Sequence, residues 1–110
     1  MDFAGPYLSE QLIAYIGNKR ALLPFLHGVF RSFALDPARS TFLDPFAGSG
    51  AVSRLARAMG FRVGANDWEP YSYEIARGTV AINAPPEFAA LGGAEAVFHT
   101  LNSLPPLEGY

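Results

Sequence analysis

Residues 42–50 read Phe-Leu-Asp-Pro-Phe-Ala-Gly-Ser-Gly, and this stretch decides the fold. The run that begins at Thr41 is apolar, with β-branched and aromatic side chains, and predicts a short buried strand. Asp44 and Pro45 end that strand and turn the chain. Residues 51–59 then predict a helix. A strand, a glycine turn and a helix in this order are typical of a nucleotide-type cofactor site, because glycines admit a ligand close to the backbone and a helix N-terminus offers unpaired N–H groups.

The residues that follow strengthen this interpretation. Gly60 is expected to end the helix, and residues 61–66 predict a second apolar strand that leads into Asp67. Asp67 lies 19 positions after Gly48. An acidic residue at about this spacing, at the tip of the second strand, is where a ribose diol is held. The full pattern G-x-G-x-x-G is absent, which favours a ligand with a ribose and no phosphates over a dinucleotide.

Three motifs together resemble a known family. Residues 42–50 are similar to the cofactor motif of S-adenosylmethionine-dependent methyltransferases that act on amino groups of DNA bases. Residues 15–19, Tyr-Ile-Gly-Asn-Lys, resemble the second cofactor motif of the Dam-like (D12 class) adenine-N6 DNA methyltransferases, and residues 66–70 resemble the acidic ribose segment. The resemblance implies an α/β, partial Rossmann-like methyltransferase fold with few parallel strands and flanking helices. It implies no catalytic residue and no metal ligand here, and nine residues that bind S-adenosylmethionine: Tyr15, Lys19, Asp44, Phe46, Gly48, Ser49, Gly50, Asp67 and Trp68.

Several of these residues have an alternative structural interpretation. Asp44 either caps the turn before Pro45 or orients the methionine ammonium group. Phe46 belongs to the core or lines the methionine pocket, and Ser49 is either a ligand contact or only a small turn residue. Asp67 is expected both to cap the following helix and to bind the ribose. Trp68 packs either in the core or, as we favour, on the adenine face.

The upstream motif also leaves alternatives open. If the two residues have no role in binding, we expect Tyr15 to be half-buried and Lys19 to lie on the surface. The resemblance favours contact with the cofactor, where Lys19 pairs with the methionine carboxylate or with a catalytic aspartate. His27 and His99 have no metal-ligating neighbours at suitable spacing and are interpreted as structural.

One departure from the family concerns the chemistry. The family's catalytic motif, Asp-Pro-Pro-Tyr, is missing, because Pro85-Pro86 is followed by Glu87 and Pro105-Pro106 by Leu107. We therefore expect residues 1–110 to be a single incomplete domain, the N-terminal cofactor-binding part of a site-specific DNA methyltransferase. A target-recognition domain is also missing, and this piece alone is expected to be inactive. The resemblance implies that in the complete enzyme the target adenine is flipped out of the duplex and its N6 attacks the methyl group.

Composition limits the partners. The net charge is −2, so DNA is expected to be contacted mainly by the missing part, since phosphate contacts need clustered Lys and Arg. The sequence has no cysteine, so we expect no disulfide and no thiolate metal site. It also has no apolar run long enough to span a membrane. We expect a cytoplasmic restriction-modification protein that self-associates through an exposed edge of strand 41–44. The alternatives are a cytosine-N4 or RNA methyltransferase fragment and a non-catalytic cofactor-binding remnant; a nucleotide-binding oxidoreductase is disfavoured.

The remaining elements follow from periodicity and from turn residues. Asn18 is a candidate helix cap, and Pro24 is expected in the first turn of the next helix. The chain is expected to run as a loosely ordered arm (1–9), an extended segment (10–16), a turn (17–18), a helix from 21–23 to 33, a polar loop (35–40), a helix (69–82), a break (83–87), a helical turn (88–91) and a helix (94–104).

Overall fold

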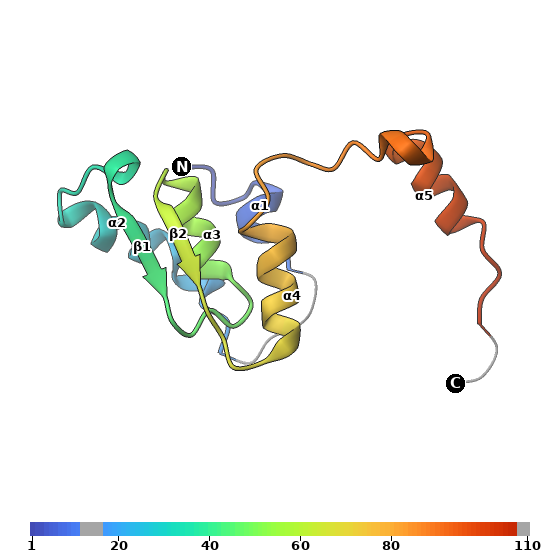
Figure 1. Cartoon of the computed structure of the whole chain (residues 1–110). Helices are drawn as coiled ribbons and strands as arrows, with labels where there is room; N and C mark the ends of the chain where they lie inside the picture. The colour runs from blue at the N-terminus through green and yellow to red at the C-terminus, as the bar shows by residue number, and fades with distance from the viewer. Residues whose placement is uncertain (12–16, 108–110) are drawn as a thin grey trace.

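The computed structural model describes residues 1–11 and 17–107. Tyr15 and most of the expected extended segment 10–16 lie outside this part of the chain. The described residues form a mixed helix and strand fold with a small parallel sheet (Figure 1). Its elements are α1 (Pro6–Ser9), η1 (Arg20–Leu22), α2 (Leu23–Ser32), η2 (Pro37–Arg39), β1 (Thr41–Asp44), α3 (Ala51–Ala58), β2 (Arg62–Ala65), α4 (Pro70–Thr79), η3 (Ala89–Leu91) and α5 (Ala94–Asn102), where η denotes a 3-10 helix.

The two predicted strands pair with each other in parallel, with Thr41 opposite Arg62 and Asp44 opposite Ala65. The prediction of parallel strands with flanking helices is therefore confirmed. The second strand is one residue shorter at each end than the predicted segment 61–66. Helix α3 connects the strands and packs against both of them. This arrangement brings the carboxyl ends of β1 and β2 to one edge, where the glycine turn and Asp67 also lie.

Helix α3 ends one residue before the predicted position, and Gly60 terminates it as expected. Gly60 has a φ of +99°, and its N–H donates to the carbonyl of Arg57 at 2.9 Å. The N–H of Phe61 donates to the carbonyl of Ala56 at 3.1 Å. This pair of bonds is the Schellman arrangement, which favours glycine because a positive φ raises the conformational free energy of other residues.

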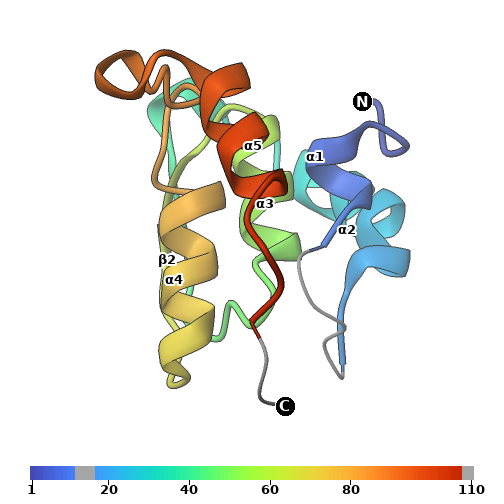
Figure 2. The same cartoon turned by 90° about the vertical axis from the view of Figure 1, so that its right-hand side faces the viewer.

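Helix α3 lies in the middle of the helical layer, with α4 on one side and α1 and α2 on the other (Figure 2). Leu8, Leu23 and Leu55 are buried there and form one hydrophobic cluster with Ala51. The expectation of a loosely ordered arm at residues 1–9 is wrong, because Pro6 starts a short helix that buries Leu8 at 3% exposure. Burial of such a side chain contributes about 1.5–3 kcal/mol and offsets part of the entropy cost of ordering this segment.

Pro24 stands in the first turn of α2, as expected. The prediction that Asn18 caps this helix is wrong, because Leu22 is the cap residue of α2 and Lys19 that of η1. The Oδ1 atom of Asn18 instead accepts a hydrogen bond from the N–H of Arg20 at 2.8 Å, in the turn before η1. The helix ends one residue before Phe33. The loop 35–40 is not wholly irregular, since it contains η2. Its cap residue, Asp36, accepts a hydrogen bond from the N–H two residues later.

Helix α4 is shorter than the predicted helix 69–82. The guanidinium of Arg57 donates to the carbonyls of Val80 and Ile82 and to the side chain of Asn83. These bonds fix residues 80–83, which follow the end of α4 at Thr79, against α3.

The C-terminal part stands apart from the rest of the fold (Figure 1). The helical turn predicted at 88–91 is η3, one residue shorter, and Gly92 and Gly93 separate it from α5 with positive φ values. Helix α5 ends two residues before 104, ahead of the Pro105-Pro106 pair that cannot continue it, and it buries no residue. The radius of gyration is 16.6 Å, against about 13 Å for a compact domain of 100 residues. No helix in residues 1–11 and 17–107 combines the length and hydropathy needed to span a membrane.

Candidate functional site

The glycine turn between β1 and α3 is held by backbone hydrogen bonds. Gly48 and Gly50 have φ values of +53° and +75°. The N–H of Gly50 donates to the carbonyl of Ala47 at 2.7 Å, and the N–H of Ala47 donates to the carbonyl of Asn66 at 2.8 Å. The turn is therefore tied to the chain that leaves β2. Both glycines adopt a left-handed conformation that is costly for other residues.

Asp67 is the central side chain of this edge. Its Oδ2 atom accepts a hydrogen bond from the N–H of Gly48 at 2.7 Å, and its Oδ1 atom accepts one from the N–H of Glu69 at 3.0 Å. These N–H groups, Glu69 first and Gly48 second, hold the pKa of Asp67 below its ordinary value. The expectation that Asp67 caps the helix is corrected, because α4 starts at Pro70 and Glu69 is the cap residue. Asp67 forms the turn just before the helix.

Asp44 has a contact that the sequence analysis missed. Its Oδ2 atom accepts a hydrogen bond from the hydroxyl of Ser53 at 2.6 Å, which joins the end of β1 to α3. Ser53 is fully buried, so this bond replaces water for both groups. The helical spacing of α3 places Ser53 on the inner face, and that was the available sequence signal.

A pocket of about 400 Å³ lies at this edge of the sheet. Residues 17–19, 46–49 and 51–52 line it together with Asp67. The pocket therefore unites the upstream motif, the glycine turn and the acidic tip, which are separated by up to 50 positions in the sequence. Lys19 is exposed at this pocket, and its Nζ atom donates to the carbonyl of Gly17 at 2.9 Å.

The predicted site residues divide into three groups. Lys19, Phe46, Gly48, Ser49 and Asp67 line the pocket. Asp44, Gly50 and Trp68 lie next to it in the chain and do not line it, and Tyr15 lies outside the described residues.

The core interpretation of the two aromatic residues is wrong, because Phe46 is 88% and Trp68 is 93% exposed. Ser49 is buried within the turn. The ring of His27 packs edge-on against the ring of Phe3, with the ring centres 5.5 Å apart. This contact supports the interpretation of His27 as a structural residue. Within residues 1–11 and 17–107, no three His, Cys, Asp or Glu side chains come together to hold a metal ion.

The described residues form a mixed helix and strand protein in which two parallel strands are joined by a helix, with a glycine turn and an acidic residue at one edge of the sheet. A family model, the D12 class N6 adenine-specific DNA methyltransferase, matches residues 15–101. The chain belongs to this family, as its motifs predicted. Searches of curated proteins and of solved structures gave no match.

Proposed function

We propose that this chain supplies the S-adenosylmethionine-binding part of a site-specific DNA adenine-N6 methyltransferase. One observation carries the proposal: the 400 Å³ pocket joins residues 17–19 to the glycine turn and to Asp67. These are the segments that the family resemblance assigns to the cofactor. Membership of a DNA adenine methyltransferase family supports the same assignment.

The donor and acceptor groups of the pocket fit such a ligand. The carboxylate of Asp67 accepts the N–H groups of Gly48 and Glu69, and it lines the pocket, where it can also accept a ribose hydroxyl. The ammonium of Lys19 donates one hydrogen bond to a carbonyl and keeps two donors for a carboxylate. The ring of Phe46 provides an apolar wall that is open to the pocket.

In the complete enzyme, the cofactor supplies a methyl group on a sulfonium centre to the exocyclic amino group of the target base. The residues of this chain act by position. Asp67 and the glycine turn hold the ribose end, and Lys19 and Phe46 hold the methionine end. Holding two reactants in alignment is a large part of the rate enhancement in group transfer. The groups that bind the base are not in this sequence, which has no Asp-Pro-Pro-Tyr.

Two alternatives remain as candidates. The family description names adenine N6 in DNA, which favours this target over cytosine N4 or RNA. The lack of Asp-Pro-Pro-Tyr supports a second candidate, in which this chain binds the cofactor and transfers nothing. Cofactor binding is common to both, and methyl transfer separates them.

Calorimetric titration of the chain with S-adenosylhomocysteine and S-adenosylmethionine tests the proposal. Phe46→Ala is the most informative variant, because the ring is exposed and its loss leaves the fold intact. We expect Phe46→Ala to weaken binding by about 0.5–1.5 kcal/mol, or roughly three- to tenfold. Phe25→Ala is a matched control, since Phe25 is also exposed and lies on α2, away from the pocket. Equal affinities of the two variants, or no saturable binding to the native chain, would refute the proposal.

A further inference from the structure

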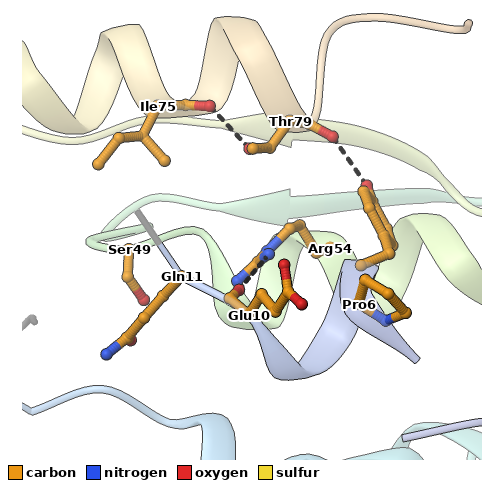
Figure 3. Close-up of a pocket in the computed structure, with 8 residues that line it drawn as sticks. Pro6, Glu10, Gln11, Ser49, Arg54, Ile75 and Thr79 are labelled. Atoms are coloured by element: carbon orange, nitrogen blue, oxygen red, sulfur yellow. Dashed lines mark hydrogen bonds between the residues drawn. The ribbon is translucent and has the colours of Figure 1, made fainter. Parts of the chain in front are cut away.

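A second cavity, of about 290 Å³, lies between α1, α3 and α4 (Figure 3). Its walls come from Pro6 and Glu10 near α1, Arg54 on α3, and Ile75 and Thr79 on α4. It shares Ser49 with the candidate cofactor pocket and otherwise uses different residues. Nothing in the proposed cofactor site requires it.

Arg54 is the unusual group in this cavity. The residue is only 6% exposed, and its Nη1 atom donates to the carbonyl of Glu10 at 2.8 Å. Its guanidinium also lies 5.9 Å from the ring centre of Tyr7. Among residues 1–11 and 17–107, its buried Nε atom has no hydrogen-bond partner and its guanidinium forms no ion pair. Buried charges are normally paired, because an uncompensated charge in the interior is costly.

A purely structural role accounts for only part of the hydrogen-bonding capacity of the Arg54 guanidinium. Arg57, one turn further along α3, shows what such a role looks like, because it binds two carbonyls and the side chain of Asn83. Arg54 has one hydrogen bond of this kind. Burial lowers the pKa of Arg54, which is the effect of an environment that solvates the cation poorly. A bound anion would remedy this.

The other walls narrow the chemistry of the ligand. The side chain of Glu10 lies at the same cavity, which disfavours a simple anion and favours a ligand that also carries a positive charge (Figure 3). Pro6 and Ile75 provide apolar surface. The hydroxyl of Tyr7 already donates to the carbonyl of Thr79 at 2.8 Å, so this bond closes the cavity between α1 and α4.

We propose that this cavity binds a free α-amino acid with an apolar side chain. The carboxylate of the amino acid pairs with Arg54, its ammonium group pairs with Glu10, and its side chain packs on Ile75 and Pro6. Guanidinium groups bind carboxylates through charge-assisted hydrogen bonds, and Arg54 is the cationic wall of the cavity. Its Nε atom is enclosed by protein, so a terminal nitrogen of the guanidinium is the donor to the ligand. The volume lies at the low end of ligand pockets, about 300 Å³, and suits a small molecule. The site does not depend on the proposed cofactor site.

The test is a titration of the 110-residue chain with L-leucine, followed by calorimetry and by NMR of the Arg54 Nε–H group. Two analogues separate the charges: 4-methylpentanoate lacks the ammonium group, and 3-methylbutylamine lacks the carboxylate. We expect L-leucine to bind and each analogue to bind about tenfold more weakly, as the loss of a charge-assisted hydrogen bond predicts. Saturating S-adenosylhomocysteine should leave L-leucine binding unchanged.

The variants follow from the same contacts. Glu10→Gln should weaken L-leucine binding about tenfold and strengthen 4-methylpentanoate binding, because the like charge beside the carboxylate is removed. Glu74→Gln is the matched control, because Glu74 is exposed on α4 outside the cavity and should have no effect. Arg54→Met should abolish binding in a chain whose circular dichroism is native.

Three results would each overturn the proposal: no saturable response to L-leucine, equal binding of L-leucine and 4-methylpentanoate, or displacement of L-leucine by S-adenosylhomocysteine. An equal effect of Glu10→Gln and Glu74→Gln would also contradict it.

Discussion

The carboxylate of Asp67 accepts a hydrogen bond from the backbone N–H of Gly48 at 2.7 Å, although the two residues are 19 positions apart. The residue proposed to bind the ribose therefore also holds the glycine turn in shape. Structure and binding are linked in this one side chain. A substitution of Asp67 must accordingly be measured for both stability and affinity.

We predict that Asp67→Ala loses most of the affinity for S-adenosylhomocysteine. The ribose hydroxyls would lose their acceptors, at a cost of about 1–3 kcal/mol, or roughly tenfold or more in Kd. Calorimetric titration measures this directly. Asp36→Ala is the matched control, because Asp36 also accepts an N–H from two residues later but lies far from the pocket in sequence and does not line it. Asp36→Ala should lower stability by about 0.5–2 kcal/mol and leave affinity unchanged. Unchanged affinity in Asp67→Ala would remove Asp67 from the site.

Acid should weaken the turn through Asp67. The folded chain holds the pKa of this carboxyl below its ordinary value of 3.8, so the unfolded chain binds the proton first as the pH falls. The contribution to stability is then complete above pH 3.8 and is lost as the pH falls through the folded pKa. Chemical unfolding of the native chain and of Asp67→Asn between pH 7 and pH 2.5 checks this. The difference in unfolding free energy should be constant at neutral pH and shrink in acid; a constant difference at every pH would contradict the assignment.

Two glycines should respond in opposite directions to alanine. Gly50 has a φ of +75°, so Gly50→Ala forces a left-handed alanine and should cost about 1–2 kcal/mol. Gly78 is helical, and a Cβ there would meet no atom within 4 Å. Gly78→Ala should stabilise the chain by about 0.4–1 kcal/mol. Thermal unfolding followed by circular dichroism compares them, and a destabilised Gly78→Ala would show that α4 is not formed as described.

We expect the purified 110-residue chain to transfer no methyl group to DNA. It has no Asp-Pro-Pro-Tyr to hold the base, and its net charge of −2 provides little attraction for phosphates. Incorporation of a labelled methyl group into duplex DNA is the measurement, with cofactor binding verified in the same preparation. Detectable incorporation would place the catalytic groups within this sequence.

The chain should self-associate. Among the described residues β1 pairs only with β2, so its other edge carries no strand, and Leu43 on the open face is 70% exposed. Helix α5 adds Phe98 and Leu101, each more than half exposed. Unpaired edges and apolar faces favour association. Light scattering should show oligomers that Leu43→Lys reduces. A chain that stays monodisperse at high concentration and unfolds cooperatively at high temperature would contradict the prediction, because it would be stable as a monomer.

Local pattern was enough to locate most elements. Thr41–Asp44 was predicted from its apolar run and Gly60 from its position after a helical stretch, and both are as expected. Asp67 was located by spacing alone, and it follows β2 as predicted. Its hydrogen bond with Gly48 was not predicted. Local pattern could not show which side chains contact one another in the folded chain. Ser53 as the partner of Asp44 is one such contact.

The sequence by itself determined the family, the order of strand, turn and helix, and the residues of the upstream motif, because these depend on residue type and on short spacings. The tertiary structure alone decided that the segment near Pro6 packs as a helix, that Arg57 holds residues 80–83 beyond α4, and that Arg54 is buried beside a cavity. Each of these depends on atoms more than 20 positions away in the chain. Burial of Leu8 and the carbonyls taken by Arg57 are long-range contacts, and local propensity carries no information about them.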